Sequence, residues 1–425
     1  MVGQEDTVMA FTRRDFIKTS AAAAVVTMAA NRAFGAARDR IKVAVIGCGG
    51  RGSGALNNCI EACKHLNLKV DVVATADWFK KKAEAVGKTH GVPAEMCFYG
   101  ADAYKKVVAT DADVILLATP PNFRPVHFEA AINAGKHVFM EKPVAVDPPG
   151  ARRIIAAGEI AKKKGLAVVA GTQRRHQAGY RQNQFAVEKG AIGRITGGCI
   201  WWCGGALWYK NREQGESAAD YMVRNWVSFA EMSGDHVVEQ HVHNIDVANW
   251  FIGHPPKYAI GFGGRARRKT GNQFDFFSVE LDYDDDCHIH SMCRQIGGAY
   301  GRVSEHFVGT EGSTWGTGKM VTDKKIAVPD FQEVGGPYVQ EHIDLLKSII
   351  DGKPLNEARN VAESTMTGIM CRIAAYTGDL VKWSDLVDNE KSSWYNLALS
   401  PSATDFEKGA VVAPKDDVVP IPGKA

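Results

Sequence analysis

Two polar segments, far apart in the sequence, carry side chains that could move a proton. The first is Glu141-Lys142-Pro143, and the second runs from Gly234 to Asp246 with several histidines and carboxylates at close spacing. A lysine ammonium can neutralise charge that develops on a substrate oxygen, and an imidazole can accept the proton of a hydroxyl group. Lys142 and His243 therefore predict acid–base chemistry on a hydroxyl group.

The second segment has the spacing of one amphipathic helix, which we expect over residues 235–251. Its apolar face would carry Val238, Val242, Ile245 and Ile252. Its opposite side would carry His236, Glu239, His243 and Asp246. Glu239 and His243 are one helical turn apart, so we expect a hydrogen bond that orients the imidazole and raises its basicity. A metal site and a solvated polar face are the alternatives, but no recognised ligand spacing is present and no metal is expected.

A glycine-rich turn, Gly47-Cys48-Gly49-Gly50-Arg51-Gly52, follows the apolar run Ile41–Ile46 and precedes a helical segment at Ser53–His65. In this context the glycines permit a tight turn, a close approach of the backbone to a pyrophosphate, and close packing of helix on strand. The free N–H groups at the start of the helix attract phosphate. We therefore expect Gly47, Gly49, Gly50, Arg51 and Gly52 to bind a dinucleotide; a glycine turn without a ligand is the alternative.

Asp77 comes about 25 residues after Gly52, near the spacing at which an acidic residue contacts the adenosine ribose. Such a carboxylate favours NAD over NADP. The nearby Lys80–Lys82 leave NADP open.

The elements that position these residues alternate between strand and helix over residues 40–170. The expected strands are Ile41–Ile46, Val70–Ala76, Asp113–Ala118, Lys136–Met140 and Ala167–Ala170. The expected helices are Ser53–His65, Trp78–Thr89, Val126–Ala134 and Pro148–Lys164. This order predicts an α/β Rossmann domain with a doubly wound parallel sheet, which binds ligands at the carboxyl ends of its strands. Thr119, Pro120, Asn122 and Glu141 follow strand ends, so we expect them to contact the cofactor.

Residues 171–391 predict a second, α+β domain with a large, open and mainly antiparallel sheet. Consecutive β-branched and aromatic runs from Arg194 to Thr310 are flanked by helical segments. Residues 392–425 read as a Pro-rich tail.

The first 36 residues predict an export signal rather than part of the fold. Arg13-Arg14 precede an Ala-rich apolar stretch and small residues suited to cleavage. The arginine pair resembles a twin-arginine signal, which predicts a periplasmic location. The net charge of +3 gives no reason to expect nucleic acid, and no membrane-spanning segment is expected after the signal is removed.

The chain resembles the Gfo/Idh/MocA oxidoreductases, including the exported branch of that family. The resemblance is carried by the glycine turn, Asp77, Ala118–Asn122, Glu141-Lys142-Pro143, His243-Asn244-Ile245-Asp246 and the turn Gly309–Gly312. The stretches Gly171–His176 and Gly234–Asn244 resemble the exported branch.

This resemblance implies roles for individual residues. Lys142 would touch both nicotinamide and substrate, and His243 would be the catalytic base. Glu239 stands where inositol-type dehydrogenases have Asp, which puts the identity of the substrate in doubt. Among the remaining residues, we expect Gln173 to contact the cofactor and Arg174, His176 and Asp246 to contact the substrate. The aromatic residues that could add to the pocket are Trp201, Trp202, Trp208, Tyr209 and Trp226.

The resulting hypothesis is an NAD(P)-dependent oxidoreductase that acts on a CH–OH group of a sugar or cyclitol. It would keep its cofactor tightly bound after export and form a dimer or tetramer through the second sheet. An NAD-dependent glycosidase or lyase, working through a transient keto-sugar, is the alternative reaction. A non-catalytic sugar-binding protein is a third interpretation, which the presence of Lys142, His243 and the glycines disfavours.

Overall fold

The first part of the chain folds around a six-stranded parallel sheet. The computed structural model describes residues 39–284 and 286–423. The strand order is β3-β2-β1-β4-β5-β6, and every neighbouring pair is parallel. The strands are β1 (Arg40–Ile46), β2 (Lys69–Asp77), β3 (Cys97–Tyr99), β4 (Val114–Leu117), β5 (His137–Met140) and β6 (Val168–Ala170). The predicted Rossmann sheet is confirmed.

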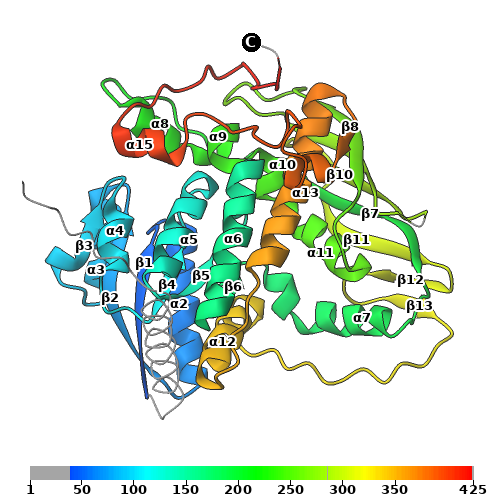
Figure 1. Cartoon of the computed structure of the whole chain (residues 1–425), viewed down its shortest axis with the longest axis horizontal. Helices are drawn as coiled ribbons and strands as arrows, with labels where there is room; N and C mark the ends of the chain where they lie inside the picture. Colours follow the sequence, from blue (N-terminus) through cyan, green and yellow to red (C-terminus); the bar gives the residue numbers. More distant parts are fainter. Residues whose placement is uncertain (1–38, 285, 424–425) are drawn as a thin grey trace, which may run out of the picture.

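Helices cover both faces of this sheet (Figure 1), so every residue of the central strands β4 and β5 is buried. One face packs against α2 and α12, and the other against α4, α5 and α6. The helices around this sheet are α2 (Gly50–His65), α3 (Lys80–Thr89), α4 (Ala103–Val108), α5 (Arg124–Asn133), α6 (Pro148–Lys164) and α12 (Pro337–Ile350). The helix α12 lies between β13 and β14 of the second sheet in sequence but packs against the first sheet.

The strand β3 and the helix α4 lie outside the elements predicted from sequence. The strand β3 has only 3 residues and α4 only 6, so neither is long enough to show a clear hydrophobic period. Elsewhere in this half the observed bounds differ from the predicted ones by a few residues at most.

The second sheet has eight strands in the order β13-β12-β11-β7-β10-β9-β8-β14. The central pair β7 and β10 is parallel and the other neighbouring pairs are antiparallel. Its strands are β7 (Ile195–Gly204), β8 (Tyr258–Gly264), β9 (Phe276–Asp282), β10 (His288–Gln295), β11 (Arg302–Gly309), β12 (Gly312–Trp315), β13 (Met320–Thr322) and β14 (Val381–Lys382). The predicted open, mainly antiparallel sheet is therefore confirmed.

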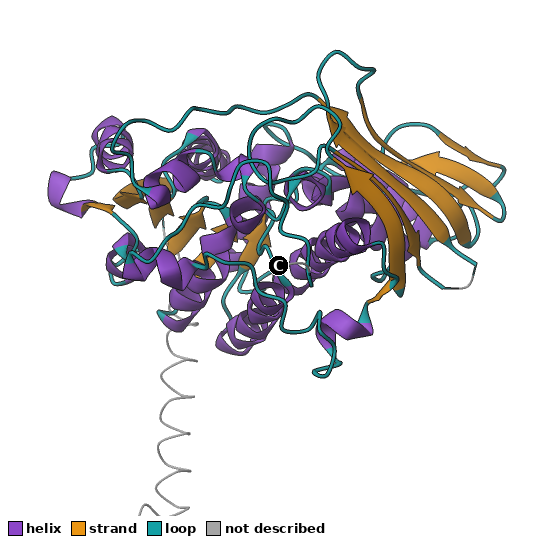
Figure 2. Cartoon of the chain, turned by 90° about the horizontal axis from the view of Figure 1, so that it is seen from above, coloured by secondary structure: helices purple, strands orange, loops and turns teal. Residues whose placement is uncertain are grey.

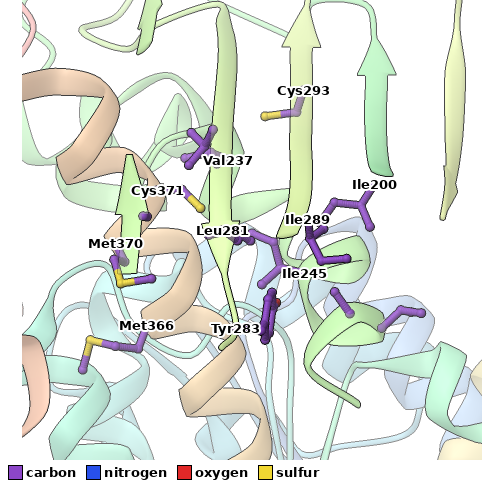
Figure 3. Packing of buried hydrophobic residues seen from close by; sticks show 14 of the residues in the cluster. Ile200, Val237, Ile245, Leu281, Tyr283, Ile289, Cys293, Met366, Met370 and Cys371 are labelled. Atoms are coloured by element: carbon purple, nitrogen blue, oxygen red, sulfur yellow. The ribbon is translucent and has the colours of Figure 1, made fainter. Parts of the chain in front are cut away.

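Helices lie against one face of the second sheet and leave the other open (Figure 2). The remaining helices are α7 (Ala178–Glu188), α8 (Ala218–Arg224), α9 (Ala230–Ser233), α10 (His236–Glu239), α11 (Val242–Ile252), α13 (Ala358–Thr377), α14 (Ser384–Val387) and α15 (Ala403–Lys408). Leu281 and Ile289 of the sheet share a buried core with Ile245 of α11 and Met370 of α13 (Figure 3). This core fixes α11 against the sheet and so sets the position of its first turn.

Two long segments reach from the second half of the chain to the first. The segment between β7 and α9 carries α8, and the C-terminal segment carries α15; both lie above α4 and α5 in Figure 1. Phe406 of α15 packs on Phe123, and the Glu407 carboxylate accepts a hydrogen bond from the Tyr104 hydroxyl at 2.8 Å. Across the described residues, no helix combines the length and the apolar character needed to cross a membrane.

Candidate active site

Two neighbouring pockets lie at the carboxyl edge of the first sheet. The turn pocket is lined by residues of the glycine turn together with Asp77, and the Lys142 pocket is lined by Lys142, Glu239 and His243 among others. Both touch the ends of β1 or β4, where the strand order reverses and open α/β sheets bind ligands. The pockets share a wall made of Ala118, Thr119 and Trp226.

The four glycines of the turn have two different roles. Gly47 has a φ of +102°, and a Cβ there would lie 2.5 Å from the carbonyl carbon of Ala118. A Cβ on Gly52 would lie 1.7 Å from the Gly47 carbonyl oxygen, whereas a Cβ on Gly49 or Gly50 would meet nothing within 4 Å. Gly47 and Gly52 are therefore needed to form the turn. Gly49 leaves its pocket side open, as the approach of a pyrophosphate requires.

Asp77 lies at the end of β2 and lines the turn pocket. Its Oδ2 accepts a hydrogen bond from the backbone N–H of Cys48 at 2.8 Å, and its Oδ1 accepts one from Phe79 at 2.9 Å. A carboxylate can accept about four hydrogen bonds, so lone pairs remain for ribose hydroxyls. Asp77 thus both fixes the glycine turn and offers the contact expected for an adenosine ribose.

Lys142 follows β5 and reaches across to the second half of the chain. Its Nζ donates to the backbone carbonyl of Glu239 at 2.7 Å and lies 3.2 Å from Oε1 of the same residue. Both side chains are about one-eighth exposed, at 13% and 12%. Glu239 therefore holds the lysine ammonium in the pocket and balances its charge.

His243 lies in the first turn of α11 and faces the Lys142 pocket. Its ring stacks on Trp202, with centroids 5.6 Å apart and planes at 19°. Its Nδ1 is buried and has no hydrogen-bond partner in the described part of the chain. Burial, together with the positive charges of Lys142 and Arg174, lowers the pKa of His243 well below its ordinary value. The imidazole is neutral at neutral pH and able to accept a proton.

The predicted hydrogen bond between Glu239 and His243 is wrong. Residues 236–252 form two helices, α10 and α11, instead of one. A turn at Gln240 and His241 interrupts the helix. Glu239 at the end of α10 turns to Lys142, and among the described residues no carboxylate raises the basicity of His243. Among the residues that the structure describes, no group of three or more His, Cys, Asp or Glu could hold a metal ion.

The three predicted substrate residues are not among those that line the Lys142 pocket. Arg174 is paired with Glu305, and the Arg175 guanidinium donates two hydrogen bonds to Asp246, at 2.8 and 3.0 Å. Buried charges need such partners, so these side chains neutralise one another where their elements pack together.

His176 is likewise held by carboxylates away from the pocket. Its Nδ1 lies 2.6 Å from Asp344 and its Nε2 lies 3.3 Å from Glu357. Burial favours the neutral ring, but Glu357 and Asp344 outweigh it and raise the pKa of His176 to about 10. The residue is a structural cation, and its partners are too distant in sequence to be predicted from local spacing.

The predicted cofactor residues divide between the two pockets. Thr119 lines both pockets, Pro120 lines the turn pocket, and Arg51, Glu141 and Gln173 line the Lys142 pocket. The Arg51 guanidinium lies 3.0 Å from Glu141 and over the ring of Tyr338.

Asn122 faces away from both pockets. Its amide donates to the backbone carbonyls of Glu231 at 2.6 Å and Pro401 at 3.0 Å, and so ties α9 and the C-terminal segment to the end of β4.

Several pocket residues were not predicted from sequence. Arg124 donates to the carbonyls of Leu117 at 2.6 Å and Thr119 at 2.7 Å, and so holds the end of β4; burial lowers its pKa to about 10, which leaves it charged. Tyr338 comes from the first turn of α12, far away in sequence. Of the five aromatic candidates, Trp208 and Trp226 line the Lys142 pocket and Trp202 supports His243.

Comparison with known proteins places this geometry in context. Residues 41–172 match the oxidoreductase family with an NAD-binding Rossmann fold, GFO_IDH_MocA. An inositol 2-dehydrogenase of Klebsiella pneumoniae is 29% identical over 217 residues, which is 50% of this chain and 54% of that protein. The chain thus spans about half the length of the curated relatives it matches.

Solved structures share the fold at lower identity. The WlbA dehydrogenase of Chromobacterium violaceum, solved with NADH and UDP-GlcNAcA, has a TM-score of 0.67 at 19% identity, over 82% of this chain and 96% of that one. A scyllo-inositol dehydrogenase of Lactobacillus casei has a TM-score of 0.62 at 20% identity, over 81% and 98%. At these identities the likeness establishes the fold.

Proposed function

The chain belongs to the Gfo/Idh/MocA oxidoreductase family, and from this premise we propose that it is an NAD(P)-dependent oxidoreductase acting on a CH–OH group of a sugar or cyclitol. One observation carries the proposal. Lys142 and the neutral His243 line the same pocket, and this pocket shares a wall with the one formed by the glycine turn. A cofactor seated along that wall would bring its reactive end to Lys142 and His243.

The proposed roles of the pocket residues follow from their contacts. Bound NAD supplies the hydride acceptor for oxidation. His243 accepts the hydroxyl proton, because its buried ring is uncharged. The Lys142 ammonium stabilises the negative charge that develops on the substrate oxygen. Glu239 keeps Lys142 in position through its carbonyl and carboxylate; this role replaces the predicted one of orienting His243.

The turn pocket fits the dinucleotide and favours NAD over NADP. Gly49 leaves space at the backbone, and Asp77 presents a carboxylate to the ribose end. A carboxylate at this position repels a 2′-phosphate. Lys82 also lines this pocket, so the preference depends on Asp77 dominating over it.

The relatives described above do not favour the glycosidase alternative, because their names are those of dehydrogenases. We keep net oxidation or reduction as the proposed reaction.

Replacing the two reactive groups separately tests the proposal. Lys142→Met and His243→Asn should each reduce turnover of the sugar or cyclitol by about a thousandfold. NAD should remain bound in both variants, because neither residue lines the turn pocket. The exposed Lys163→Met on α6 is the matched control and should retain wild-type activity. Near-normal turnover in both reactive-site variants would refute the proposed chemistry.

Export and assembly remain further proposals. The predicted twin-arginine signal at residues 1–36 lies outside the described residues; cell fractionation of an Arg13→Lys, Arg14→Lys double variant would test export to the periplasm. A protein working there gains from a retained cofactor, because free NAD(H) is not supplied outside the cytosol.

We also propose a dimer or tetramer that forms through the open face of the second sheet. Two large apolar side chains of β8, Ile260 and Phe262, are 44% and 66% exposed on this sheet. Light scattering of a Phe262→Glu variant would detect the loss of assembly.

A further inference from the structure

A half-exposed tryptophan lies at the rim of the Lys142 pocket. Trp208 is 47% exposed, and it belongs to the long segment between β7 and α9. Trp226, from the end of the same segment, is less exposed and lines the same pocket. The two indole rings are 6.1 Å apart with planes at 69°. Since His243 is only 7% exposed, the pocket passes from a buried reactive group to an open aromatic wall.

Polar contacts hold the segment that presents Trp208. The Arg224 guanidinium donates to Glu216 at 2.7 Å, to Glu213 at 2.8 Å and to the carbonyl of Asn211 at 3.0 Å. The buried Asn225 side chain accepts from the N–H of Lys210 at 2.8 Å and donates to its carbonyl at 3.0 Å. The segment is therefore fixed in place, and the exposed indole is presented to the pocket mouth rather than left on a loose loop.

An indole kept half in water loses part of the hydrophobic stabilisation that its burial would provide. The two indoles meet edge to face, so the half-exposed ring of Trp208 offers one uncharged flat face, which suits the C–H face of a pyranose ring or an aromatic group. The charged and neutral groups that do chemistry, Lys142 and His243, lie deeper in the pocket. A ligand that stacks on Trp208 and also presents a hydroxyl group to His243 extends from the exposed rim of the pocket to its buried end.

We infer that Trp208, supported by its edge-to-face contact with Trp226, forms an outer subsite that stacks on a second ring of the substrate, so that the enzyme acts on a glycoside rather than on a free monosaccharide. The inference rests on the proposed function for the inner ring, which would be the one oxidised beside His243. The second ring is either another sugar or an aromatic aglycone, since both offer a face to indole.

Calorimetric titration of the NAD-loaded protein tests the subsite without requiring turnover. The probes are glucose, cellobiose and 4-nitrophenyl β-D-glucoside. We expect at least one of the two-ring probes to bind more tightly than glucose. In Trp208→Ala its affinity should fall by about tenfold, the effect of losing one aromatic contact, while glucose affinity changes by less than about twofold. Trp208→Phe keeps an aromatic face and should retain most of the affinity.

The pattern among the probes identifies the second ring. A Trp208-dependent gain for cellobiose indicates a sugar, and a gain for the aryl glucoside alone indicates an aglycone. Equal affinities for all three probes, no binding of any probe, or two-ring affinities unchanged in Trp208→Ala would overturn the inference. Turnover is measured separately by the near-ultraviolet absorbance of NADH. Trp208-dependent binding without turnover would therefore contradict the proposed function and leave the subsite standing.

Discussion

At the scale of single residues, the site depends on a histidine that is kept neutral and a lysine that is kept in place. Lys142 and His243 could be predicted from sequence, because each stands in a polar run beside a predicted element. The partner of Glu239 could not be predicted. One helical turn of separation implies contact only if the helix is continuous, and here it breaks between Glu239 and Val242. Contacts of Arg174, His176 and Asp246 were equally hidden, since their partners are distant in sequence.

The lowered pKa of His243 predicts the pH dependence of oxidation. A base whose pKa lies well below its ordinary value of about 6.5 stays unprotonated as the pH falls through that value. Sugar oxidation should therefore show no loss of kcat/KM centred near pH 6.5, and its acid limb should lie at lower pH. A pH–rate profile on the wild-type protein measures this. A limb at or above pH 6.5 that disappears in His243→Asn would contradict the buried, neutral imidazole.

At the scale of elements, the alternation of strands and helices was sufficient to predict the parallel sheet and the edge at which it binds ligands. The short β3 and α4 gave too little periodicity. The sequence predicted α10 and α11 as a single helix, because the spacing of apolar residues continues across Gln240 and His241 while the helical backbone conformation does not. Glu239 and His243 still lie beside the Lys142 pocket, because both helices pack against the second sheet and α13.

The glycine turn gives a prediction that separates binding from folding. Gly49→Ala should leave the melting temperature nearly unchanged, since a Cβ there meets nothing within 4 Å, but should weaken NAD binding by about tenfold or more. Gly52→Ala should instead lower the melting temperature, because its Cβ would clash with the Gly47 carbonyl oxygen. Thermal unfolding and NAD titration of the two variants measure this contrast. Equal effects of both substitutions on stability would argue against the assigned roles.

At the scale of the whole molecule, the second half of the chain closes over the cofactor edge of the first. The C-terminal segment contacts Tyr104 of α4 through Glu407 and contacts Gly271, in the loop between β8 and β9, through Asp416, so it bridges the two halves of the chain. Such contacts, between residues about 300 and 145 positions apart, leave no local pattern in the sequence. The return of α12 to the first sheet was hidden for the same reason.

Phe406 tests whether this closure retains the cofactor. Its ring is 2% exposed and packs on Trp78 and Phe123, two residues that line the turn pocket. Phe406→Ala should cost about 3 kcal/mol of unfolding free energy and should speed the release of NAD. Val412→Ala, at a side chain that is 80% exposed on the same segment, is the control and should change neither. Denaturant unfolding measures the loss of stability, and NAD release after dilution measures retention of the cofactor. An unchanged rate of NAD release from a destabilised Phe406→Ala variant would show that this packing does not retain the cofactor.

The most direct test of the account is hydride transfer itself. The purified wild-type protein, loaded with NAD, is mixed with a panel of sugars, glycosides and cyclitols, and the near-ultraviolet absorbance of NADH is recorded. We expect a rise with at least one compound, and no rise with that compound in His243→Asn or Lys142→Met. The absence of a rise with every compound while NAD stays bound, or an equal rise in both variants, would contradict the proposed oxidoreductase.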